Sequence, residues 1–110
     1  RHAEIFEDAF AISICPSDGV ESPTIIGAQA ANELLNIVGV KASIVLTEFQ
    51  NKIYISARSI DEVNVQVLME KLGGGGHMSV AGAQLAGVTM EEAVRQVKDV
   101  IRKMLDEGEL

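Results

Sequence analysis

The run of four glycines from Gly73 to Gly76, followed at once by His77, is the feature that most constrains how this chain can fold. Consecutive glycines cost so much backbone entropy that a helix reaching them ends there. Because they carry no Cβ, their N–H groups can converge on an anion, and His77 can donate to a phosphate oxygen. The alternative is a flexible connection with a solvent-exposed histidine. No Gly-Lys-Ser or Gly-Lys-Thr follows, so the run is not the phosphate loop of P-loop NTPases.

Apolar runs and alternating residues predict the strands of a sheet. Residues 52–58 alternate most clearly, which predicts one face made of Ile53, Ile55 and Ala57 and an opposite face made of Lys52, Tyr54, Ser56 and Arg58. Residues 42–49 are apolar on both faces, as in a central strand, and are expected to pair with residues 52–58 in a hairpin. Further strands are expected at residues 9–15, before a turn at Pro16-Ser17-Asp18-Gly19, and at residues 82–87.

Capping residues and apolar residues at helical spacing predict three helices. The first begins at Ser22-Pro23 and is expected to reach about Val38, which would lie on its buried face. The second has Asp61 or Asn64 as its cap and ends at the glycine run. The third begins with a capping box of Thr89 and Glu92. Its buried stripe is expected to be Met90, Val94, Val97, Ile101 and Met104.

The predicted order is strand, helix, strand, strand, helix, strand, helix over 110 residues, which is the size of one domain. This order is typical of a sheet with helices packed on it. We therefore expect an α/β fold with a mixed sheet of about four to five strands, in a single domain over residues 1–110. The order of the strands within the sheet is not readable from these patterns.

The charge of the chain limits the partners that it can bind. Nine Lys and Arg against sixteen Asp and Glu give −7, which disfavours a broad grip on duplex nucleic acid and contact with an anionic membrane. Residues 49–90 hold three basic and three acidic side chains and are neutral, whereas residues 1–48 carry −5 and residues 91–110 carry −2. The glycine run therefore lies in a segment that can hold a local anion pocket. The single cysteine, Cys15, excludes an internal disulfide and fits a reducing compartment.

Arg58-Ser59 is a second candidate site, because it ends the alternating strand on the polar face. A guanidinium pairs with phosphate in a bidentate fork. Residues 61–72 form a connection of about one helix, which can return the chain to the same sheet edge and bring Arg58 and His77 to one anion. The alternative is a solvated arginine. Neither the two histidines nor any Asp, His and Cys cluster has the spacing of metal ligands or of a hydrolytic triad.

Four segments together resemble the DHHA1 domain, the C-terminal half of DHH-type phosphoesterases. They are Ser56-Ala57-Arg58-Ser59, Asn64-Val65-Gln66, Gly73-Gly74-Gly75-Gly76-His77 and Ala81-Gly82-Ala83, and the resemblance covers about residues 8–105. The sequences of these segments are most similar to those of membrane-anchored bacterial cyclic-di-AMP phosphodiesterases. Many members have Ala-Ala-Gly where this chain has Val80-Ala81-Gly82, and the valine is expected to narrow the space behind the loop.

This resemblance implies that catalysis and substrate binding are carried out by different domains. A preceding DHH domain would hold two manganese ions that activate water, while this chain would bind the substrate and hold no cofactor itself. Carried over by motif, Arg58 and Ser59 would hold phosphate, Gly73, Gly74, Gly75 and Gly76 would offer N–H groups, and His77 would bind a phosphate oxygen. Because the chain does not begin with Met, we expect a piece of a longer protein, and the resemblance implies that this piece is cytoplasmic and that the whole protein is membrane-anchored. Alone it is expected to be inactive and to make no direct membrane contact.

Three alternatives stay open at this point. The first is a phosphoesterase for short oligonucleotides or adenosine bisphosphate, which shares the same motifs. The second is a nucleic-acid-binding module, as in RecJ-like exonucleases and alanyl-tRNA synthetases. The third is a regulatory or dimerisation domain with an empty glycine loop. The expected partners are a cyclic dinucleotide or short oligonucleotide and the DHH lobe of the same polypeptide, with a homodimer as a further possibility.

Overall fold

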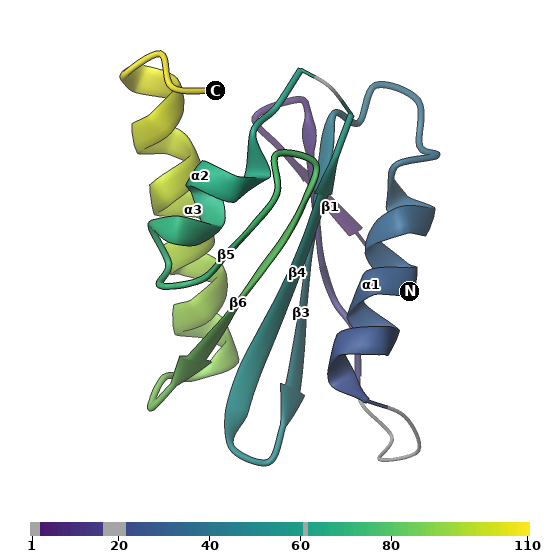
Figure 1. The fold of residues 1–110 in the computed structure, drawn as a ribbon, viewed down its shortest axis with the longest axis vertical. Helices are drawn as coiled ribbons and strands as arrows, with labels where there is room; N and C mark the ends of the chain where they lie inside the picture. The colour runs from purple at the N-terminus through teal and green to yellow at the C-terminus, as the bar shows by residue number, and fades with distance from the viewer. Residues whose placement is uncertain (1–2, 17–21, 61) are drawn as a thin grey trace.

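The computed structural model describes residues 3–16, 22–60 and 62–110, which form six strands and three helices (Figure 1). In chain order the elements are β1 (Ala3–Phe6), β2 (Phe10–Ile14), α1 (Pro23–Leu34), β3 (Ala42–Phe49), β4 (Lys52–Ser59), α2 (Val65–Glu70), β5 (Gly75–Gly76), β6 (Val80–Ala86) and α3 (Met90–Asp106). Ser17, Asp18 and Gly19 of the predicted turn, and the predicted cap Asp61, lie outside the described residues.

The strands form one mixed sheet in the order β1-β2-β3-β4-β6-β5. Strands β2 and β3 run parallel, whereas every other neighbouring pair is antiparallel. A parallel pair needs a crossover connection, and α1 between β2 and β3 supplies it. The predicted α/β fold class is confirmed. The described sheet has six strands because the short edge strands β1 and β5 add to the four that the sequence pattern predicted.

Helices cover both faces of the sheet, with α1 on one face and α2 and α3 on the other (Figure 1). The larger core lies between the sheet and α2 and α3 and includes Ile53 and Ile55, whereas a smaller core lies under α1 around Val45. Burying an isoleucine contributes about 1.5–3 kcal/mol, so the apolar face of β4 turns toward the larger core. The polar face of β4, which the alternation predicted, therefore lies on the α1 side of the sheet.

The hairpin of β3 and β4 is confirmed, with its register running from Ala42 opposite Ser59 to Phe49 opposite Lys52. Its turn residues Gln50 and Asn51 have φ angles of 52° and 66°. Two consecutive positive φ angles are typical of the tight turn whose twist matches that of antiparallel strands. Residues 42–47 are buried, as expected of a central strand covered on both sides.

The third helix follows the sequence closely. The Glu92 backbone N–H donates to Thr89 Oγ1 at 3.1 Å, and the Thr89 N–H donates to Glu92 Oε1 at 3.0 Å, which confirms the capping box. Val97, Ile101 and Met104 of the predicted stripe are fully buried, while Met90 and Val94 are partly buried against the same core. The stripe packs α3 onto the sheet face opposite α1.

Helix α1 differs from the prediction at its end, whereas α2 begins after Asn64, one of its two candidate caps. Helix α1 ends at Leu34 rather than near Val38, because the next residues form turns with bonds such as Ile37 N–H to Leu34 O at 3.2 Å. The expected burial of Val38 is therefore wrong, and this side chain is 99% exposed. Helix α2 begins at Val65, where the Asn64 side chain accepts from the N–H groups of residues 66 and 67 at 3.0 and 3.2 Å.

Candidate functional site

An open cavity of about 640 Å³ lies on the α1 side of the sheet, over β4 and β6 and bounded by the glycines of β5. We call it the β4–β6 groove. Its floor includes Ser56 and Gly82, which stand opposite each other in the register. Helix α1 contributes Thr24 to the lining. It packs close to the sheet at Gly27, where a Cβ would lie 2.6 Å from Ser56 Oγ, so the missing side chain lets α1 lie directly against Ser56.

Arg58 provides the positive charge of the groove. It is half-buried, and its Nη1 donates to the carbonyl oxygen of Ala57 at 2.8 Å, which fixes one side of the guanidinium. Burial lowers the pKa of Arg58, but a guanidinium stays charged at neutral pH. None of the carboxylates that the structure describes forms an ion pair with Arg58. Its remaining N–H groups are therefore available to an anion.

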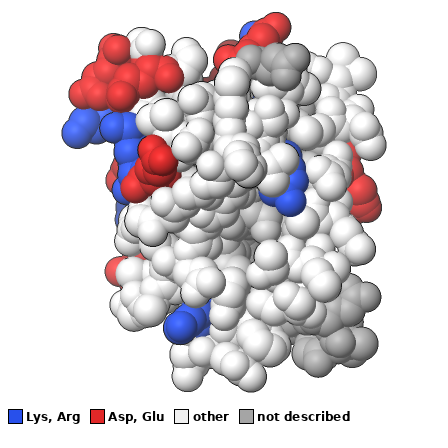
Figure 2. Space-filling model, in the orientation of Figure 1, with Lys and Arg blue, Asp and Glu red and all other residues white. Residues whose placement is uncertain are grey.

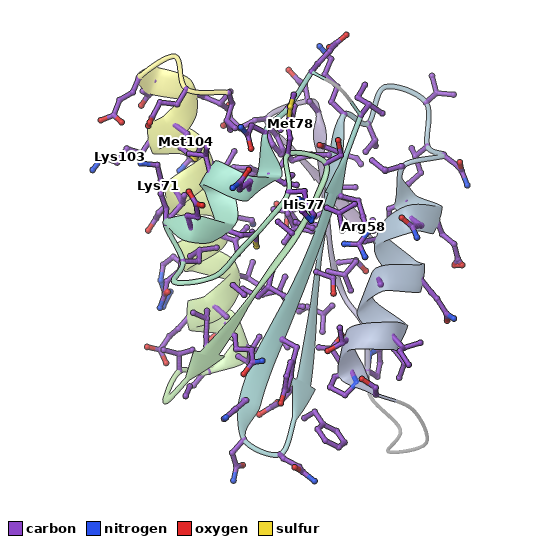
Figure 3. The ribbon with its side chains drawn as sticks, viewed as in Figure 1. Arg58, Lys71, His77, Met78, Lys103 and Met104 are labelled. Atoms are coloured by element: carbon purple, nitrogen blue, oxygen red, sulfur yellow. The ribbon has the colours of Figure 1, made fainter. Side chains whose placement is uncertain are left out.

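His77 lies beside Arg58, as the sequence predicted. Its backbone N–H donates to Val80 O at 2.7 Å and its carbonyl accepts from Val80 N–H at 3.3 Å, so residues 77–80 form a tight turn. Val80 in turn is the register partner of Arg58. Figure 3 shows the two labelled side chains at the same end of the strands, and both line the groove. In the same orientation, Figure 2 shows an uncharged surface around the Arg58 position, with the acidic side chains lying away from it.

The glycine run differs from the expected nest of four N–H donors. Gly73 N–H donates to Glu70 O at 3.1 Å, and Gly74 N–H donates to Met69 O at 2.8 Å, so both satisfy carbonyls at the end of α2. Because His77 and Val80 exchange both backbone hydrogen bonds, ladder alternation gives the next such pair to Gly75 and Gly82. Gly76 lies between these two pairs, so its N–H is the one in the run that donates neither to α2 nor to β6. Three of the four glycine N–H groups therefore have backbone partners in this structure, and phosphate binding by the run stays a prediction.

Space, rather than N–H donation, explains most of the glycines. A Cβ on Gly76 would lie 2.5 Å from the Cα of Ala81, and one on Gly74 would lie 2.7 Å from the Cα of Ala83. Gly73 has a φ of +87°, which side chains disfavour. Gly75 differs, because a Cβ there would meet nothing within 4 Å. The run lets β5 press against β6 and leaves free volume beside Gly75.

Ser59 is not brought to the groove. It lies on the opposite face of β4 from Arg58 and is buried, with its hydroxyl donating to Val63 O at 2.6 Å. A second contact reaches Met78 O at 3.3 Å. In this structure the Ser59 hydroxyl is therefore directed away from the groove, and its contact with phosphate stays a prediction. The residue ties the segment after β4 to the turn that carries His77.

Three lining residues were missed or left undecided by the sequence. Tyr54 shares the Arg58 face, as the alternation predicted, but no role was assigned to it, and it lines the groove. Gln84 and Thr24 also line it, although neither had a sequence signal. Val80 lines the groove directly and is 46% exposed, rather than filling space behind the loop.

The described residues contain neither a cluster of metal ligands nor a helix that could cross a membrane. Within residues 3–16, 22–60 and 62–110, no three or more His, Cys, Asp or Glu side chains gather as a metal ion would require. None of the helices in those ranges is both long and apolar enough to cross a membrane.

Comparison with known proteins shows the family to which the chain belongs. Residues 10–106 match the model of the DHHA1 domain. The chain is 50% identical over 99 residues to the cyclic-di-AMP phosphodiesterase PdeA of Listeria monocytogenes serotype 1/2a (strain 10403S), covering 89% of this chain and 15% of that protein. It is 43% identical over 109 residues to the cyclic-di-AMP phosphodiesterase GdpP of Geobacillus thermodenitrificans (strain NG80-2), covering 98% of this chain and 16% of that protein.

A solved structure agrees with the sequence comparison. An exopolyphosphatase-related protein from Bacteroides fragilis superposes with a TM-score of 0.77 at 25% identity, over 93% of this chain and 31% of that one. The chain thus spans about one sixth of the length of the curated relatives it matches. The family match, the identities and the superposition all cover nearly the whole chain, which therefore belongs to the DHHA1 domain family.

Proposed function

We propose that this chain is the substrate-binding lobe of a phosphodiesterase that hydrolyses cyclic-di-AMP to the linear dinucleotide. The observation that carries the proposal is the pair formed by Arg58 and His77, side by side in an open groove with no described carboxylate paired to the arginine. Two relatives whose names specify cyclic-di-AMP, at 50% and 43% identity, support this substrate.

The groove acts by holding phosphate in place. Arg58 is anchored by its bond to Ala57 O, so its remaining guanidinium N–H groups present a fixed fork to two phosphate oxygens. The exposed imidazole of His77 donates to an oxygen of the same phosphate. Gly76 supplies the one N–H of the glycine run that donates neither to α2 nor to β6. A phosphate held by several donors keeps its ester bond oriented for attack, which reduces the entropy lost in the reaction.

Activation of water is assigned to another part of the polypeptide. We place the two manganese ions implied by the family in a DHH lobe, because the described residues of this chain gather no set of metal ligands. Bound there, such ions would supply a nucleophilic hydroxide and stabilise negative charge on the phosphate. The DHH lobe is thus the intramolecular partner of the groove. We further propose that both lobes lie in the cytoplasm, in a membrane-anchored protein.

Turnover by the full-length protein tests this proposal. Arg58→Ala is expected to lower kcat/KM for cyclic-di-AMP about 10- to 100-fold, since a hydrogen bond to a charged group contributes about 1.5–3 kcal/mol. Arg95→Ala, on the exposed surface of α3, is the matched control and should leave the rate unchanged. A preference of the unmodified protein for short single-stranded oligonucleotides over cyclic-di-AMP would contradict the proposal. That result would favour the oligonucleotide phosphoesterase instead.

A further inference from the structure

The end of the β4–β6 groove away from Arg58 has its own set of side chains. Tyr54 and Gln84 stand opposite each other in the register of β4 and β6, and both line the cavity. Cross-strand partners share a face, so the ring and the amide rise from the sheet side by side. Arg58 is four positions after Tyr54, which is about 13 Å along a strand. The groove thus has two chemically different ends.

The polar groups at this end have no partner within the described protein. Neither the Tyr54 hydroxyl nor the Gln84 amide hydrogen-bonds to a described residue. Tyr54 is half-buried, so the sheet restrains its ring, whereas Gln84 is exposed to the cavity. Between this end and Arg58 the accessible floor is Gly82 of β6, which carries no side chain, whereas its partner Ser56 is buried against α1. A flat molecule can therefore lie along the β6 side of the floor.

We propose that Tyr54 and Gln84 form a nucleobase subsite with a preference for adenine. An aromatic ring stacks on any base, which contributes about 1–3 kcal/mol. A glutamine amide offers one donor and one acceptor side by side, and this pair matches N7 and the exocyclic N6 amine of adenine. Guanine presents two acceptors on the same edge and cannot satisfy the amide oxygen. This subsite rests on the proposed function, because it reads the base of a nucleotide whose phosphate Arg58 holds.

Two small probes separate base recognition from phosphate recognition in the full-length protein. Adenosine 5′-monophosphate carries base and phosphate, whereas ribose 5-phosphate carries no base. Gln84→Ala is expected to weaken binding of adenosine 5′-monophosphate about tenfold and to leave ribose 5-phosphate unchanged. Gln29→Ala, which removes an exposed amide from α1 away from the groove lining, should change neither. Equal effects of Gln84→Ala on both probes, or no effect on either, would overturn the subsite.

Substitutions at Tyr54 test the stacking contact. Tyr54→Phe keeps the ring and should bind adenosine 5′-monophosphate as the unmodified protein does. Tyr54→Leu keeps an apolar side chain in the strand but removes the stack, and should weaken that probe about tenfold without weakening ribose 5-phosphate. A thermal melt of each variant confirms that the fold is retained. If Tyr54→Leu binds adenosine 5′-monophosphate normally, the ring has only a packing role.

A substitution that changes the preferred base from adenine to guanine tests the subsite most directly. Arginine pairs with the two acceptors of guanine, so Gln84→Arg should raise the ratio of guanosine to adenosine 5′-monophosphate affinity at least tenfold. The ratio cancels any general gain in phosphate affinity from the added charge. An unchanged ratio would contradict the assignment of Gln84 to the base edge. Failure of the proposed function has a different signature, since Arg58→Ala would then leave the affinity for both adenosine 5′-monophosphate and ribose 5-phosphate unchanged.

Discussion

Gly74 and Gly82 approach each other so closely that a side chain on Gly74 would collide with the carbonyl oxygen of Gly82. This contact presses the chain after α2 against β6, and the β4–β6 groove opens on the other side of the same strands. Cross-strand partners share a face, so a side chain on Gly75 would project beside Gly82, on the groove side. Neighbouring glycines of one motif therefore have different tasks, one in packing and one at the site.

Alanine substitutions separate these tasks. Gly74→Ala is expected to lower the free energy of unfolding by about 1–3 kcal/mol, because the new methyl group meets backbone that cannot move aside. Gly75→Ala should melt close to the unmodified protein, since its Cβ meets nothing within 4 Å. It should instead weaken cyclic-di-AMP binding by filling the groove. Equal melting temperatures for the two variants would show that the close contact with Gly82 does not limit stability.

Ser59→Ala tests whether this residue positions the site or binds phosphate. Its hydroxyl donates to Val63 O at 2.6 Å in a buried environment, so its loss leaves a buried carbonyl with one bond fewer. We expect the free energy of unfolding to fall by about 1–2 kcal/mol. We expect little change in Kd for cyclic-di-AMP at temperatures where the variant is folded. A large loss of affinity at unchanged stability would restore the direct phosphate contact.

The capping box of α3 predicts a pH dependence. Backbone and side-chain hydrogen bonds from Thr89 lower the pKa of Glu92, so the folded state favours its charged form. A carboxyl whose pKa is lower when folded adds stability above its unfolded pKa, near 4.3, and loses it as the pH falls through the folded value. Glu92→Gln should therefore lower the melting temperature at pH 7 and have less effect at pH 3. Glu91→Gln, at an exposed neighbouring site without this bond, is the control. An equal effect of Glu92→Gln at both pH values would contradict the charge-dependent bond.

Much of the framework could be predicted because local chemistry determines it. Alternation in residues 52–58 assigned Tyr54 and Arg58 to one face, and burial of Ile53 and Ile55 holds them there. The capping box likewise depends only on residues three apart. Strand β5 escaped prediction because glycines have neither the side chains nor the propensity that mark a strand. Strand β1 was missed because three of its four residues are not fully buried.

The rest of the site depends on long-range pairing. Gln84 carries no signal within its own segment and gains one only when β6 pairs with β4 and sets it opposite Tyr54. The direction of the Gly73 and Gly74 N–H groups depends on how α2 ends, which a run of glycines does not determine. The alternation along β4 does predict that Ser59 lies on the opposite face from Arg58. The expectation that Ser59 binds phosphate came instead from the family motif, which assigns both residues to phosphate binding.

The affinity of the full-length protein for cyclic-di-AMP, measured by calorimetry without added metal so that no turnover occurs, tests the central claim most directly. With Arg58 as the charged anchor of the groove, Arg58→Ala should raise Kd about 10- to 100-fold, and Arg95→Ala should leave it unchanged. An Arg58→Ala variant that is folded and binds cyclic-di-AMP with unchanged Kd would contradict the assignment of the β4–β6 groove as the phosphate site.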